Sequence, residues 1–257
     1  MEIALPWVQI FVLGVVRVAA FLVQAPILGT SAVPMLVKVM LALVLGFFLM
    51  PGDAVSAANQ AWGWLPFMLL LLKETLVGWL MGISLFVLMA ALQAAGELVG
   101  FQMMFSAAST FSMLNLEQST VTGNLFNFLA MLVFVGVDGH HALLGALDLS
   151  FRVLPVFSFP ASLGTFHAWS TLLGRIFEIS VKLSLPLLAA LFITNAILGM
   201  IARTMPQINV FVIGMPVQIV AGFVILIMML GGLIAAETHG FMQWAHELKG
   251  FIHQLQP

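Results

Sequence analysis

QAAGELVGFQMMFSAASTFSMLNLEQSTVTGN, residues 93–124, is unlike the rest of this strongly apolar chain. Long apolar runs precede and follow it, yet it holds no Lys or Arg and only two acidic residues, Glu97 and Glu117. It is too polar to cross a bilayer as a lipid-facing helix and too apolar for an ordinary solvated loop. Backbone that is not cleanly helical is tolerated at membrane depth only where protein buries it or where it lines a cavity. One hypothesis is therefore that this stretch lines or plugs a passage; the alternative is a long extramembrane connection whose Met and Phe side chains pack on helix ends.

The composition identifies an integral membrane protein. The chain has 257 residues, of which 62% are hydrophobic and 7% are charged, whereas soluble domains carry about 25% charged residues. So few charges could not cover a surface that faces water. The net charge of −2 excludes the basic footprint of a nucleic-acid-binding protein, and the absence of cysteine excludes disulfides, thiolate metal sites and a Cys nucleophile.

The apolar runs predict an all-α membrane protein with about six long, Gly/Pro-broken hydrophobic helices in hairpins and a C-terminal amphipathic helix. A membrane-spanning helix needs about 20 apolar residues, and most of the runs reach that length. The expected helices cover residues 3–28, 33–50, 64 to beyond 89, 125–137 with a second piece at 142–151, 172–201 and 217–236. The short fourth run suits a re-entrant or partner-buried helix.

Three parts follow from this pattern. Residues 1–124 form an N-terminal helical part that ends in the central stretch, residues 125–236 form C-terminal helical hairpins, and residues 237–257 form a tail. Apolar residues recur in the tail at three- and four-residue steps, which is typical of an amphipathic helix. Because the tail has one Lys and no Arg, we expect it to dock on a partner rather than on anionic lipid.

Ionisable groups inside apolar helices are costly, so they are functional candidates. Arg17 has no acid three or four residues away, so its partner must come from another helix or another subunit. We interpret it as a fixed charge at an assembly interface or a passage; the alternative is an arginine that reaches out to water. Lys73 and Glu74 are adjacent and are expected to point to different faces, so no pairing is predicted between them.

Two further groups of charges have simpler interpretations. The pairs Glu178–Lys182 and Asp148–Arg152 are four residues apart, a spacing that predicts ion pairs within one helix. Asp138, His140 and His141 form a polar cluster, but a zinc site needs three or four ligands that converge, and adjacent His side chains of a helix should point apart. We therefore expect a hydrated helix break, with no metal and no cofactor.

No motif in the sequence indicates catalysis. A nucleophile elbow, a phosphate-binding glycine loop, an H-E-x-x-H helix and a paired-carboxylate motif are all missing from the sequence, so we do not expect an enzyme. A proton-driven transporter should carry acidic residues within its spans. Most acids here lie at run ends or in connections, so a stand-alone small-solute transporter is the alternative and not the leading interpretation.

Residues 202–216, ARTMPQINVFVIGMP, carry the most specific pattern. Pro206 pushes Met205 toward extended geometry, and Gly214 and Pro216 are expected to break the chain again. The segment between these breaks is either a tight turn or a docking surface. Its pattern A-R-T-x-P-Q-x-N-x-F-x-x-G-x-P resembles the FliR family of bacterial flagellar biosynthesis proteins, homologous to the T component of type III secretion export gates. APILG at 25–29 and GELVGFQ at 96–102 resemble the family's first hairpin and the segment that leads into its central loop.

The resemblance implies a non-enzymatic channel subunit of the flagellar type III protein export gate, in the bacterial inner membrane and the flagellar basal body. One such chain would assemble with several copies of FliP-type and FliQ-type subunits, an FlhB-type subunit would join them, and unfolded export substrates would pass transiently. The resemblance also implies that the central loop, at about residues 105–122, plugs the pore. It leaves a virulence-type system open, although the pattern favours a flagellar one.

Two sets of candidate site residues result. Met side chains are flexible and re-pack easily, which suits a soft constriction for varied chains. The predicted gate residues are Met103, Met104, Phe105, Phe111, Met113 and Leu114. The predicted assembly-interface residues are Arg17, Glu97, Arg203, Pro206, Gln207, Asn209, Phe211, Gly214 and Pro216.

Overall fold

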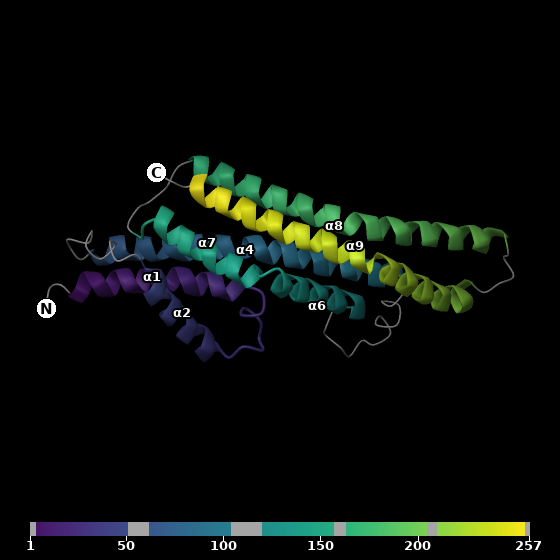
Figure 1. Cartoon of the computed structure of the whole chain (residues 1–257), viewed down its shortest axis with the longest axis horizontal. Helices are drawn as coiled ribbons and strands as arrows, with labels where there is room; N and C mark the ends of the chain where they lie inside the picture. The colour runs from purple at the N-terminus through teal and green to yellow at the C-terminus, as the bar shows by residue number, and fades with distance from the viewer. Residues whose placement is uncertain (1–3, 51–61, 104–119, 157–162, 205–209, 255–257) are drawn as a thin grey trace. The chain divides into compact units, whose positions relative to one another are not determined.

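The computed structural model describes residues 4–50, 62–103, 120–156, 163–204 and 210–254, and these residues form helices, turns and bends without any strand (Figure 1). The prediction of an all-α protein is confirmed. The helices are α1 (Ala4–Gln24), α2 (Met35–Leu49), α4 (Trp64–Gln102), α6 (Val121–Gly136), α7 (Gly139–Val153), α8 (Leu163–Thr204) and α9 (Val210–Gln254).

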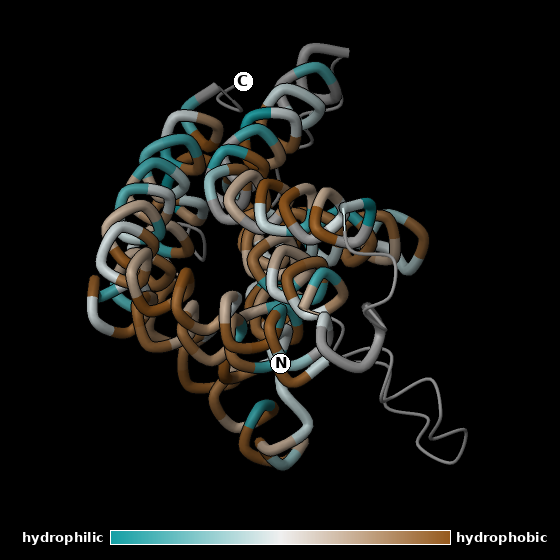
Figure 2. The backbone as a smooth tube through the Cα atoms, turned by 90° about the vertical axis from the view of Figure 1, so that its right-hand side faces the viewer, coloured by the Kyte–Doolittle hydropathy of each residue, from teal (hydrophilic) through white to brown (hydrophobic). Residues whose placement is uncertain are grey.

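Several of these helices are suited to a membrane. Within the described ranges, three segments are long and apolar enough to cross one: Leu5–Gln24, Trp64–Gln102 and Pro216–His253. Helices α6 and α7 add a bent pair that would be a broken span or a re-entrant loop. Figure 2 shows hydrophobic residues on most helical turns. These features agree with the membrane protein expected from the composition.

The helix break at Asp138 is where the sequence predicts it. Asp138 adopts a left-handed backbone with φ of 56°, a conformation that is uncommon outside glycine but that Asp tolerates better than most residues. It separates α6, which ends at Gly136, from α7, which starts at Gly139.

Two expected breaks are absent, because glycines and a proline lie inside continuous helices. Helix α4 continues to Gln102, so the first ten residues of the stretch 93–124 are helical. Helix α9 passes through Gly214 and Pro216 and continues into the predicted tail. Pro216 removes one backbone hydrogen bond near the start of a long helix, and apolar helices tolerate this loss. Gly214 is buried, which is consistent with a packing role.

The chain divides into two compact units. The first unit comprises Met1–Val87, Asp138–Ile176 and Met242–Pro257, and the second comprises Leu88–Val137 and Phe177–Phe241. Each unit has its own core. The core of the first contains Ile10, Leu13, Leu70 and Val156. The core of the second contains Val99, Met103, Phe126, Leu226 and Leu233.

The apolar face of the predicted tail packs inside the first unit. Trp244 is fully buried, and its indole Nε1 donates a hydrogen bond to the buried Ser84 Oγ at 3.0 Å. The Phe251 ring lies against Trp169, with ring centroids 4.1 Å apart. The amphipathic pattern was therefore correct, but this face docks on the same chain and not on a partner.

We expect Trp244→Phe to lower the thermal midpoint of the detergent-solubilised chain by at least about 2–4 °C. The change leaves the Ser84 hydroxyl without this donor, and a net hydrogen bond is worth about 1 kcal/mol. The smaller ring also leaves part of the buried indole volume empty, which adds to the loss. The exposed Met242 provides the control, since Met242→Leu should leave the midpoint unchanged. An unchanged midpoint for Trp244→Phe would show that the hydrogen bond adds nothing.

Candidate functional site

Both ends of the predicted plug are anchored in the second unit. Met103 closes the last turn of α4, where its N–H donates to the Val99 carbonyl at 2.9 Å. Thr120 is the N-cap of α6, and its Oγ1 accepts from the Gly123 N–H at 3.0 Å. This side-chain cap satisfies one of the free N–H groups at a helix start. The chain thus enters and leaves residues 104–119 through ordered helix ends.

Three glycines bring these two helix ends together. A Cβ at Gly96 would lie 2.7 Å from the Phe126 Cβ, and one at Gly123 would lie 2.6 Å from the Glu97 Cγ. At Gly100 an added Cβ would collide with the Thr122 hydroxyl and would lie 3.1 Å from the Thr120 Oγ1. Small residues allow such close approach of helix backbones. We call this junction of α4 and α6 the neck; it consists of Gly96, Gly100, Met103, Thr120, Thr122 and Gly123.

Met103 is the one predicted gate residue among those that the structure describes. Its side chain is 1% exposed and lies in the core of the second unit. It covers Gly222 of α9, where an added Cβ would lie 2.5 Å from the Met103 Cγ and 2.7 Å from its Sδ. The other predicted gate residues, Met104, Phe105, Phe111, Met113 and Leu114, lie outside the described residues, so their role stays a prediction.

A chain of three amide side chains joins α4, α8 and α9 beside the neck. Asn195 Nδ2 donates to Gln102 Oε1 at 3.3 Å, and Gln218 Nε2 donates to Asn195 Oδ1. Gln218 Oε1 is buried and has no hydrogen-bond partner in the described part of the chain. Sequence reasoning missed this group, although amides inside apolar runs were a usable signal, because polar side chains in membrane helices tend to bond across helices.

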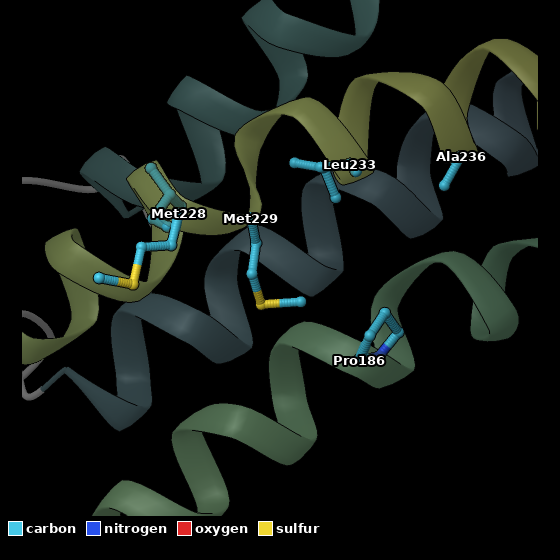
Figure 3. Close-up of a pocket in the computed structure, with 7 residues that line it drawn as sticks. Pro186, Met228, Met229, Leu233 and Ala236 are labelled. Atoms are coloured by element: carbon cyan, nitrogen blue, oxygen red, sulfur yellow. The ribbon is translucent and has the colours of Figure 1, made fainter.

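An apolar pocket of about 260 Å³ lies in the second unit between α8 and α9. Figure 3 shows Pro186 on α8 across this pocket from Met229 and Leu233 on α9. Its lining residues are Pro186, Leu226, Met228, Met229, Gly232, Leu233 and Ala236. Because binding sites for small polar molecules include a few convergent polar groups, this pocket is not suited to a polar solute.

The first unit contains a buried charged cluster. Arg17 is 0% exposed and forms an ion pair through Nε with the Glu74 carboxylate. Lys73 Nζ lies 2.7 Å from Glu74 Oε1. The expectation that Lys73 and Glu74 do not pair was therefore wrong, since the long Lys73 side chain reaches back to its neighbour. The partner of Arg17 comes from another helix of the same chain, and Arg17 does not reach water.

The same two cations hold the C-terminal end of α7. Arg17 Nη1 donates to the Ser150 carbonyl at 3.0 Å, and Nη2 donates to the Leu154 carbonyl at 2.9 Å. Lys73 Nζ donates to the carbonyls of Pro155 and Val156, each at 3.2 Å. The last carbonyls of a helix have no partners within the helix and carry partial negative charge. The cluster therefore fixes where α7 ends relative to α1 and α4.

The remaining assembly-interface candidates differ in exposure where the structure describes them. Glu97 is half-buried in the second unit, where its Oε1 accepts from Gln93 Nε2 at 3.3 Å. Arg203 and Pro216 are exposed. Pro206, Gln207 and Asn209 lie outside the described residues, and so does the side chain of Phe211. Their role in assembly stays a prediction.

The two ion pairs predicted within single helices are present. Lys182 Nζ lies 2.6 Å from Glu178 Oε1, and Arg152 Nε lies 3.0 Å from Asp148 Oδ2. The Asp138 cluster differs from expectation, because the two His side chains do not point apart. His141 Nδ1 and His140 Nε2 lie 3.4 and 3.9 Å from Asp138 Oδ1, and all three side chains are exposed. The Asp138 carboxylate thus lies beside the first turn of α7.

Comparison with known proteins gives a consistent result over almost the whole chain. Residues 8–244 match the family model "Bacterial export proteins, family 1". The "Flagellar biosynthetic protein FliR" of Bacillus subtilis (strain 168) is 33% identical over 239 residues, which cover 90% of both chains. The protein of that name from Pectobacterium carotovorum subsp. carotovorum is 30% identical, covering 97% of this chain and 95% of the relative. That of Escherichia coli (strain K12) is 29% identical, covering 98% and 95%.

Proposed function

The chain belongs to the bacterial export proteins of family 1, the family of the flagellar FliR proteins, and on this premise we propose that it is the subunit that closes the export pore. As a member of this family it is a membrane component of the flagellar export apparatus. The pore that it closes would pass unfolded flagellar subunits. The observation that carries this proposal is the neck, where Met103 and Thr120 hold both ends of residues 104–119 against α4.

The proposed mechanism is steric and involves no covalent chemistry. Because residues 104–119 are attached to helices at both ends, they could move out of a passage and return to the same position. Because the neck lies in an apolar core, the segment would start from apolar surroundings, where flexible Met side chains adapt to varied neighbours. Energy for export would come from other components, since the sequence carries no phosphate-binding motif.

The proposed partners are several FliP-type and FliQ-type subunits around one copy of this chain, with an FlhB-type subunit bound to that core in the inner membrane and the basal body. Exposed apolar side chains support a partner or lipid cover along α8. These include Phe177, Leu185, Phe192, Ile193, Ile197 and Met200. Monomers rarely expose so extended an apolar surface to water.

Native mass spectrometry of the tagged chain, extracted in mild detergent from its own cells, tests this composition. We expect a discrete complex that holds one copy of this chain and several copies of two small membrane proteins. The untagged strain processed in parallel controls for carry-over of unrelated proteins. A lone monomer or homodimer would contradict the proposal and would make the small-solute transporter the better hypothesis.

A further inference from the structure

We propose that the amide chain and the contact between Met103 and Gly222 together form a latch that holds the neck closed. This inference rests on the proposed gate function and extends it to residues that sequence motifs did not identify. The latch consists of Gln102, Met103, Asn195, Gln218 and Gly222. None of these residues needs to contact an export substrate; they act by positioning the end of α4.

The polar half of the latch acts on the last residue of α4. Gln102 accepts the Asn195 amide at 3.3 Å, and Asn195 in turn accepts the Gln218 amide. In apolar surroundings an amide that loses its partner finds no water to replace it, so these bonds oppose movement of the helix end. The network is incomplete, because Gln218 Oε1 is buried without a partner in the described structure. A partly satisfied network is weaker than a complete one, which suits a contact that must release.

The apolar half of the latch acts on the next residue. Met103 wraps Gly222 so closely that any side chain there would meet its Cγ, Sδ and Cε within 2.7 Å. The Met103 Cγ is not the free end of the side chain, so Met103 could not accommodate a Cβ by a small rotation. The last residue of α4 and the residue after it are thus held by α8 and α9. At the other end of the segment, Thr120 Oγ1 caps α6 and lies 3.1 Å from the position that a Cβ at Gly100 would take.

Breaking the latch should raise ion leak through the assembled complex. Asn195→Leu keeps the side-chain size and removes both hydrogen bonds, and each interhelical bond in a membrane shifts an equilibrium by about 3- to 20-fold. We therefore expect a leak increase of about tenfold for this variant. The neighbouring Thr194→Val is the control, since the Thr194 hydroxyl donates to the Ala190 carbonyl of its own helix at 3.0 Å.

Gly222→Ala tests the apolar half. It should displace Met103 and raise the leak, whereas Gly231→Ala in the same helix meets no atom within 4 Å and should leave the leak unchanged. Both changes replace Gly by Ala within α9, so they have the same effect on helix propensity. The measurement is the loss of membrane potential in cells, normalised to the amount of assembled complex.

A reversible disulfide distinguishes a latch from general damage. The natural chain has no cysteine, and the Met103 Cγ lies 2.5 Å from the position of a Gly222 Cβ. The Met103 Cβ is one bond away from this Cγ, so the two Cβ positions are close enough to test for a disulfide. In the Asn195→Leu background, oxidising the Met103→Cys/Gly222→Cys pair should return the leak to the wild-type level and stop export. A reductant should reverse both effects. A disulfide that forms without reducing the leak would overturn the proposal.

The outcomes separate the latch from the gate itself. If deletion of residues 106–118 causes leak while Asn195→Leu and Gly222→Ala do not, the latch is wrong and the gate stands. If the deletion also leaves an assembled complex tight, the gate is wrong and the latch falls with it. If neither latch variant assembles, the Met103→Cys/Gly222→Cys pair in the otherwise natural chain tests the latch instead. A latch that must open for export predicts that oxidation of this pair stops export. Unimpeded export after oxidation would refute the latch.

Discussion

Deleting residues 106–118 should leave the export complex assembled and make the membrane permeable to ions. The deletion removes most of the proposed plug but keeps the neck, including the Met103 contact with Gly222 and the Thr120 cap of α6. Residues 104, 105 and 119 remain between the two ends, and a link of this length spans about 13 Å. Since Thr120 already contacts the last turns of α4, we expect both helices to keep their places.

The size of this effect depends on how firmly the gate is closed. If the closed state is populated at about 99:1, removing the plug raises the open population by up to about 100-fold. A control chain carrying a Gly/Ser segment of the natural length tests whether the apolar side chains matter, and it should leak as well. Co-purification of the partner subunits reports assembly in both cases. A fully assembled deletion complex with unchanged leak would remove the plug from the proposed function.

Sequence periodicity was sufficient for most of the helices and for local pairs. Apolar runs of spanning length placed α1, α2 and the start of α4, and the four-residue spacing of Asp148 and Arg152 correctly predicted their ion pair. These features depend on neighbours within a few residues, so the sequence displays them directly. The break at Asp138 also follows from local polarity.

Glycine and proline were the main source of error. Gly96 and Gly100 belong to the stretch 93–124, which was not expected to be cleanly helical, but both lie inside α4 and let Phe126 and Thr122 approach its backbone. In the sequence alone, a glycine that interrupts a helix cannot be distinguished from a glycine that lets a neighbouring helix pack closely. The difference is set by a segment about 20 to 30 residues away, which propensity alone does not report.

The tertiary partners of buried polar groups could not be identified from the sequence either. The need of Arg17 for a partner was clear from its apolar run, but the choice of Glu74 depends on how α1 packs beside α4. The amide chain through Asn195 unites residues separated by 93 and 23 positions. Sequence reasoning therefore identified that costly groups required partners, and the fold was needed to identify them.

Replacing Arg17 with Leu should destabilise the chain strongly and reduce the amount of assembled complex. The change leaves the buried Glu74 with Lys73 alone, and it removes the donors that hold the Ser150 and Leu154 carbonyls. Removing one partner of a buried ion pair costs about 3–5 kcal/mol. Because Lys73 still compensates Glu74 here, we expect the loss to come from the missing Arg17–Glu74 bond and from the two carbonyls that lose their donors. The measurements are the thermal midpoint of the solubilised chain and the yield of co-purified partner subunits.

Two comparisons show whether burial is the cause. Arg152→Leu removes an arginine from an exposed pair with Asp148, and such pairs contribute about 0.3–0.5 kcal/mol, so this control should assemble normally. The double variant Arg17→Leu/Glu74→Leu should be less stable than Arg17→Leu alone, because it takes the Glu74 carboxylate away from the buried Lys73 cation, which the single variant leaves paired. Lys73 would still donate to the Pro155 and Val156 carbonyls in that variant.

Full recovery of complex with Arg17→Leu would mean that the cluster contributes nothing to assembly. A stable but unassembled chain would instead assign Arg17 a specific role in placing α7 for its partners.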